Sequence, residues 1–95
     1  MDSGIADQDR AIADIIRALL NARVPDASIC PSEVARQAAS HGTDWRGLMP
    51  RILEVAAELA HRGALTITRG EEILHPDELS GGTIRLRRGR NWTKA

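Results

Sequence analysis

The chain changes its hydrophobic period at Ala64-Leu65-Thr66-Ile67-Thr68-Arg69, where apolar and polar residues begin to alternate. A period of two is typical of a half-buried strand. A second alternating stretch, Thr83-Ile84-Arg85-Leu86-Arg87, comes after the turn residues Gly70-Glu71-Glu72 and a short apolar piece, Ile73-Leu74. We therefore expect two strands that pair as a hairpin.

The first half of the chain shows helical spacing instead. Apolar residues from about Ile5 to Arg23 form one stripe at a period of 3.6 residues. Ser28-Ile29 is predicted to be extended, with Ile29 filling the core. A second helix is predicted from Pro31, which fits a first helical turn, to a stop at His41-Gly42.

A third helical region precedes the hairpin. Asp44 can cap its start at Trp45. Pro50 either begins a fresh helix after a single turn at 45–48 or kinks a continuous one. The apolar stripe then continues to a stop at Arg62-Gly63.

The order helix, short extended piece, helix, helix, strand, strand predicts an α+β fold, mostly α, of the winged-helix type. The hairpin is the wing, and Ser28-Ile29 supplies a third strand. The alternative is a generic α+β domain with the hairpin packed elsewhere. Either way, 95 residues suit a single domain, with its core at about 5–88 and a basic tail at 89–95.

Composition narrows the class of protein further. The apolar runs are too short for a membrane helix, and the polar start is not that of a secretory signal. The single cysteine, Cys30, cannot form an internal disulfide, so we expect a reducing cytoplasm. With no Phe or Tyr, base stacking is an improbable way to bind nucleic acid.

Thirteen basic and thirteen acidic residues cancel, yet the charge is polarised along the chain. Residues 1–44 hold four basic and seven acidic side chains, a balance of −3, and residues 45–95 hold nine and six, a balance of +3. Residues 85–95 hold five basic and no acidic side chains. A basic surface can therefore coexist with a neutral total.

Two strings stand out, Ser28-Ile29-Cys30-Pro31-Ser32-Glu33-Val34-Ala35-Arg36 and Trp45-Arg46-Gly47-Leu48-Met49-Pro50. Together with Ile84-Arg85-Leu86 they resemble a bacterial family known only as a domain of unknown function and assigned to the winged-helix superfamily. The resemblance covers roughly residues 11–87. It implies a winged-helix fold and brings no activity, substrate or catalytic residue.

Double-stranded DNA is the first candidate partner, because a helix-turn-helix places the start of its second helix in the major groove. The candidate DNA-binding residues are Arg36, Arg46, Arg51, Arg69, Arg85, Arg87, Arg88 and Arg90. Arg88-Gly89-Arg90 also resembles the centre of a minor-groove AT-hook, without its proline. Glu54 and Glu58 would repel phosphates if they faced the groove.

Other interpretations remain open. The scaffold could serve as a protein-interaction module without DNA, and a homodimer could form through the helix at 5–23. Trp45 is expected in the core rather than against a partner. A redox-sensing thiol at Cys30 is a third hypothesis.

No set of residues has the spacing typical of an enzyme active site, and we expect no catalytic residue, cofactor or metal. Cys30, His41, His61 and His75 match no zinc spacing.

Overall fold

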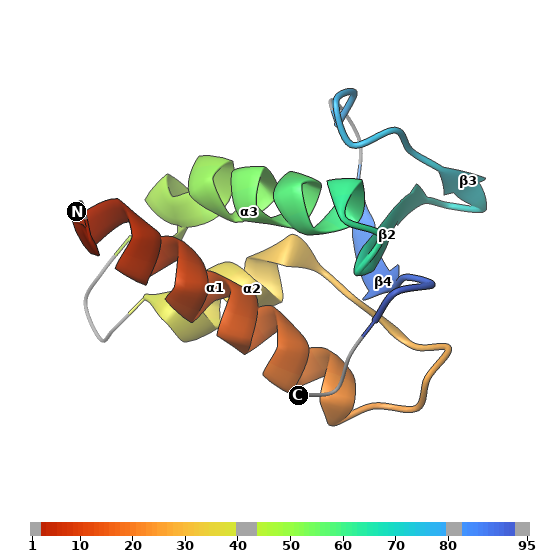
Figure 1. Cartoon of the computed structure of the whole chain (residues 1–95), viewed down its shortest axis with the longest axis horizontal. Helices are drawn as coiled ribbons and strands as arrows, with labels where there is room; N and C mark the ends of the chain where they lie inside the picture. The colour runs from red at the N-terminus through yellow and green to blue at the C-terminus, as the bar shows by residue number, and fades with distance from the viewer. Residues whose placement is uncertain (1–2, 40–43, 80–82, 93–95) are drawn as a thin grey trace.

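The computed structural model describes residues 3–39, 44–79 and 83–92 (Figure 1). These residues form three α-helices, one 3₁₀ turn and four strands. In chain order the elements are α1 (Ser3–Asn21), β1 (Ser28–Ile29), α2 (Pro31–Ala38), η1 (Trp45–Leu48), α3 (Met49–His61), β2 (Leu65–Arg69), β3 (Glu72–Ile73) and β4 (Arg85–Arg88). The predicted α+β class, mostly helical, is confirmed.

The local signals explain where the helices begin. Pro31 occupies the first turn of α2, where its missing N–H costs no hydrogen bond. The Asp44 carboxylate accepts a bond from the backbone N–H of Arg46 at 3.1 Å and so caps η1. Pro50 lies in the first turn of α3, so it starts a fresh helix after the 45–48 turn rather than kinking a continuous one.

The strands form one antiparallel sheet in the order β1-β4-β2-β3. The expected hairpin is the β2–β4 pair, in which Ile67 lies opposite Leu86, and Ile29 on β1 also lies opposite Leu86. The edge strand β3 was not predicted. It has only two residues, both exposed, and so carries no periodic signal.

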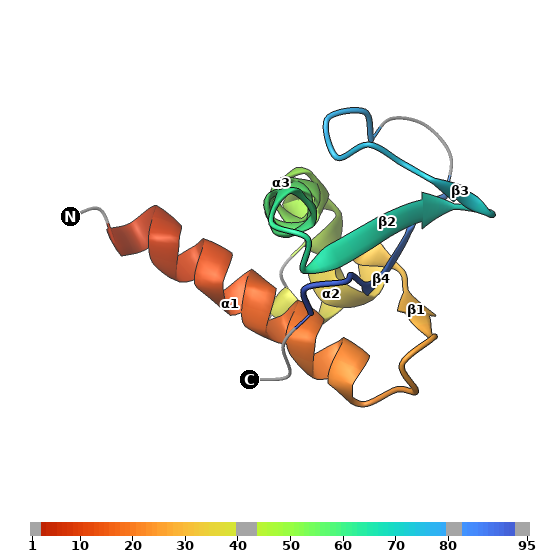
Figure 2. The ribbon, with the colours of Figure 1, turned by 45° about the vertical axis from the view of Figure 1, so that its right-hand side comes forward.

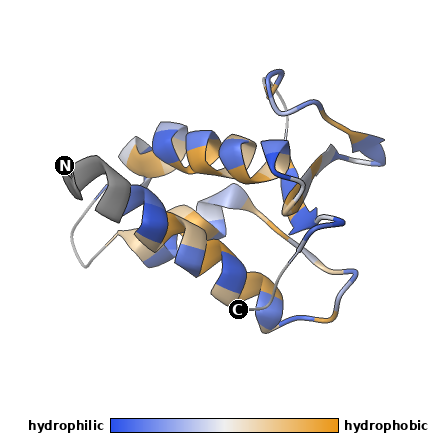
Figure 3. Cartoon of the chain, viewed as in Figure 1, coloured by the Kyte–Doolittle hydropathy of each residue, from blue (hydrophilic) through white to orange (hydrophobic). Residues whose placement is uncertain are grey.

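The core lies between the helices and the inner face of the sheet. Ile16 and Ile52 from the helices and Ile67 and Leu86 from the sheet are almost fully buried in one cluster. Figure 3 shows that the hydrophobic side of α3 faces the other helices and that its hydrophilic side faces outward. The winged-helix arrangement inferred from the element order is compatible with this packing.

The predicted basic tail is folded onto the domain over residues 89–92. Gly89 donates its backbone N–H to the Ala64 carbonyl at 2.9 Å, and Asn91 donates to the Gly63 carbonyl at 2.8 Å. Trp92 packs against the core. Figure 2 shows this blue segment beside the C-terminal half of α1.

The second helix ends earlier than the predicted stop at His41-Gly42, because α2 ends at Ala38 and Ala39 is already extended. The end of the predicted basic tail, at 93–95, lies outside the described residues. No helix among the described residues is both long and apolar enough to cross a membrane.

Candidate functional site

Two candidate arginines on β4 lie on the outer face of the sheet. Side chains alternate along a strand, so Arg85 and Arg87 point away from the core that holds Leu86. Arg85 donates through Nε to the Ser28 hydroxyl at 2.9 Å and through Nη2 to the Ser28 carbonyl at 3.1 Å. Arg87 donates to the Asp26 carbonyl at 2.8 Å. These neutral acceptors orient both guanidinium groups without cancelling their charge.

Arg88 points to the opposite side of β4, toward the end of α1. It donates to the carbonyls of Leu20 and Arg23 at 2.9 and 3.0 Å. These carbonyls lie at the negative end of the helix dipole, where a cation is favourable. The guanidinium also lies 5.6 Å from the Trp92 ring centroid. Because Arg88 is held there and Gly89 packs on Ala64, the Arg88-Gly89-Arg90 segment is folded against the domain.

Trp45 brings two other candidate arginines together. The Cζ atoms of Arg36, on α2, and Arg46, on η1, lie 4.7 and 4.6 Å from the centroid of its ring. The ring itself is half-buried against the core, in keeping with the expected core position. The sequence pointed to each of these residues but not to their meeting at one ring, because Arg36 is nine positions away from Trp45.

Two more candidate DNA-binding arginines form ion pairs with carboxylates. Arg51 Nη1 lies 3.5 Å from Asp9 Oδ1 and 3.4 Å from Glu54 Oε1. Arg69 Nη2 lies 3.4 Å from Glu72 Oε1. The same holds for Arg17 with Asp14, Arg23 with Glu33, and Arg62 with Glu58. Most of these ion pairs include a residue of α1 or α3.

The outward face of α3 carries two exposed glutamates, each within ion-pair distance of an arginine. The side chains of Glu54 and Glu58 are 70% and 63% exposed, and Pro50 and His61 are exposed on the same helix. Arg51 is tied to Asp9 on α1 as well as to Glu54. The sequence alone did not determine which way Glu54 and Glu58 point. In the structure both side chains are exposed to solvent.

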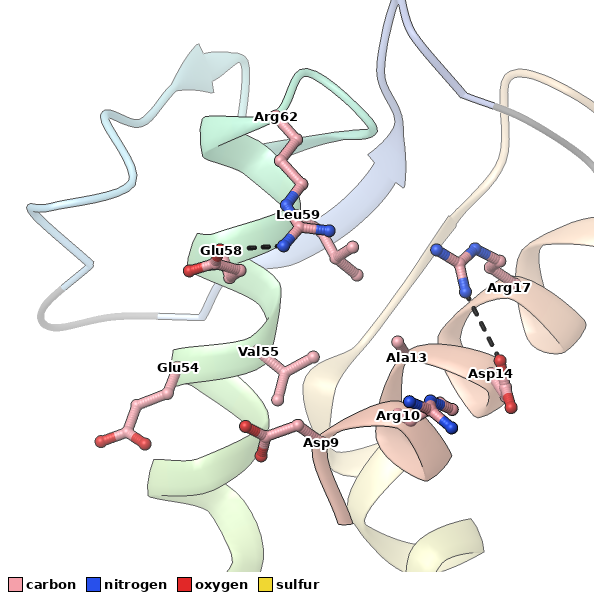
Figure 4. Close-up of a pocket in the computed structure, with 10 residues that line it drawn as sticks. All are labelled: Asp9, Arg10, Ala13, Asp14, Arg17, Glu54, Val55, Glu58, Leu59 and Arg62. Atoms are coloured by element: carbon pink, nitrogen blue, oxygen red, sulfur yellow. Dashed lines mark hydrogen bonds and ion pairs between the residues drawn. The ribbon is translucent and has the colours of Figure 1, made fainter. Parts of the chain in front are cut away.

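A groove of about 790 Å³ runs between α1 and α3. Figure 4 shows Ala13, Val55 and Leu59 between the two helices and Glu54 and Glu58 pointing away from α1. The α1 wall carries Arg10, Asp14 and Arg17. The walls are therefore charged with both signs above a small apolar floor.

The remaining candidates are the cysteine and the histidines. Cys30 Sγ lies 3.1 Å from the Ser32 hydroxyl at the start of α2. His61 Nε2 lies 2.9 Å from Asp77 Oδ1, and the ring of His75 lies edge-on to that of His61 at 6.3 Å. His41 lies outside the described residues. Within the described parts of the chain no three His, Cys, Asp or Glu side chains are grouped as metal ligands.

One known family matches this chain over nearly all of its helices and strands. The model of a family described as "Protein of unknown function (DUF3253)" matches residues 9–89. The chain belongs to this family. The match runs from Asp9, in α1, to Gly89, the residue after β4, so it includes every candidate arginine except Arg90.

Membership in DUF3253 supports the expected resemblance to a domain-of-unknown-function family. It assigns no ligand or reaction to the arginines. No curated protein matches the chain.

Proposed function

We propose that this DUF3253 chain is a double-stranded DNA-binding module of the bacterial winged helix-turn-helix type, acting in the cytoplasm. It binds mainly through contacts of arginines with the phosphate backbone. Such contacts dominate the affinity of many DNA-binding proteins and do not require a basic total charge.

The observation that carries the proposal is the sorting of the arginines. Those on β4 and around Trp45 have no described carboxylate within ion-pair distance, and the same is true of Arg10 on α1, whereas Arg17, Arg51 and Arg62 do have one. An arginine bound to a backbone carbonyl keeps its full positive charge and its remaining N–H donors. It is oriented before a phosphate arrives, which lowers the entropic cost of binding.

We do not propose that α3 contacts base edges in the major groove. A recognition helix enters the major groove between two rows of phosphates. Exposed Glu54 and Glu58 on α3 would be repelled there. We therefore expect weak discrimination between DNA sequences and a strong dependence on salt.

The test is a titration of a fluorescently labelled random duplex at several salt concentrations. The test variant is Arg87→Gln/Arg90→Gln, because both side chains are exposed and Arg87 makes a single hydrogen bond to a described residue. Arg85 and Arg88 stay unchanged, since each makes two bonds that hold the strand. If both residues contact phosphates, the slope of log K against log[salt] falls by roughly 2, about 0.9 for each contact.

The matched control is Arg17→Gln/Arg62→Gln. It removes the same two charges from positions that face Asp14 and Glu58. We expect it to leave the salt slope close to that of the wild type. Equal slopes in both variants, or absence of binding by the wild type at low salt, would contradict the proposal.

A protein-interaction module is the second candidate, and the groove between α1 and α3 is the observation that favours it. Its apolar floor of Ala13, Val55 and Leu59 between charged walls suits a protein segment better than a phosphate backbone. The same titration separates the two candidates. A protein-interaction module binds no duplex at low salt.

A further inference from the structure

The ring of Trp45 lies where two chain segments meet. Arg36 reaches it from α2, and Arg46 follows it directly in η1. Three local features hold the arrangement: the Asp44 cap on η1, the packing of Trp45 against the core, and the contact of α2 with η1. Neither arginine is therefore a free surface side chain, although both are exposed.

The two charges at this ring form no ion pair. Among the described residues, no carboxylate lies within ion-pair distance of Arg36 or Arg46, and the indole is neutral. The Asp44 carboxylate accepts the backbone N–H of Arg46 and keeps its charge, so Arg36, Asp44 and Arg46 together carry one net positive charge. Two like charges near one ring repel each other, so an anion that contacts both would relieve the repulsion.

Packing on the ring also leaves hydrogen-bond donors available. A guanidinium carries five N–H groups in its own plane, in a fork that matches the oxygens of a phosphate. Neither side chain donates a hydrogen bond to a described residue, so these donors are left for a ligand. The ring therefore acts as a support that positions two phosphate-binding forks.

We propose that Arg36, Trp45 and Arg46 form a clamp for the phosphodiester backbone of duplex DNA at the helix-turn-helix. This inference rests on the proposed function and names the contact that fixes the strand beside the start of α3. An extended array of phosphates can reach both guanidinium groups at once.

The experiment uses the two tryptophans of the chain. In a Trp92→Phe background, Trp45 is the single fluorescent indole, and it reports directly on the clamp. We expect its emission to change as duplex DNA is added, because bound phosphates alter the position and charge of the two guanidinium groups that lie over the ring. The salt slope of Arg36→Gln/Arg46→Gln is expected to fall by about 2 relative to its parent.

Two further variants separate charge from geometry. Arg36→Lys/Arg46→Lys keeps both charges but loses the planar forks, so we expect a wild-type slope with affinity lowered severalfold. Arg17→Gln/Arg62→Gln removes two charges elsewhere and should leave both the slope and the Trp45 signal unchanged. Thermal melting checks that each variant is folded.

The outcomes are distinct. Duplex binding with an unchanged slope in Arg36→Gln/Arg46→Gln overturns the clamp and leaves the proposed function standing. Absence of binding by the wild type overturns the proposed function and the clamp with it. If the Gln variant does not fold, a Trp45 emission that stays constant at saturating DNA overturns the clamp.

Discussion

Two groups of arginines, one on α1 and α3 and the other on β4, use the same residue type in different ways. In the first group, Arg17, Arg51 and Arg62 each face a carboxylate. In the second group, Arg85 and Arg88 donate to uncharged acceptors. The first arrangement neutralises charge at the surface, and the second fixes charge in position.

This difference teaches that counting charges along a chain does not locate a binding surface. An exposed ion pair contributes little to stability and presents little net field. A guanidinium bound to a carbonyl contributes a charge-assisted hydrogen bond and still presents its field to solvent. Removing the two kinds of arginine should therefore have very different consequences.

The largest effect is expected from Gly89→Ala, which tests whether the end of β4 is held rigidly. A Cβ at this position would lie 2.4 Å from the Gly63 carbonyl oxygen and 2.9 Å from the backbone of Leu65. Backbone atoms cannot rotate away, so we expect a loss of about 2–3 kcal/mol in the free energy of unfolding. Chemical denaturation measures this loss.

Gly47→Ala is the control for that substitution. Its Cβ would meet only Asp44 Oδ2, at an ordinary contact distance of 3.7 Å. We expect no significant loss of stability. If Gly89→Ala were equally harmless, the segment after β4 would not be packed as described.

Arg88→Ala is expected to have the next largest effect. It leaves the Leu20 and Arg23 carbonyls at the end of α1 without their shared donor. Because the bond to Leu20 is partly buried and the bond to Arg23 is exposed to water, we expect a loss of about 2 kcal/mol. Arg87→Ala, which loses one exposed bond to Asp26, should cost less than about 1 kcal/mol in the same denaturation assay.

Arg62→Gln should have the smallest effect. Its partner Glu58 lies one helical turn away at 3.2 Å, and both side chains are well exposed. Such a pair contributes about 0.3–0.5 kcal/mol. A loss as large as that of Arg88→Ala would remove the distinction between the two groups of arginines.

Much of the fold could be predicted from the sequence because its signals are local. Pro31, Asp44 and Pro50 act on their own turns, and the period-two stretch at 64–69 is a property of neighbouring residues. The strand β3 was missed because two residues carry no period. Residues 89–92 were predicted as tail because their packing depends on Gly63 and Ala64, far away in the chain.

The candidate site was predictable only as a set of arginines. The sequence alone determined that basic residues gather in the second half of the chain, since composition and order do not depend on folding. Whether each charge is neutralised depends on what lies next to it in space. Only the tertiary structure decided that Arg51 faces Asp9 while Arg36 and Arg46 meet at Trp45, because these contacts join helices that the chain itself keeps apart.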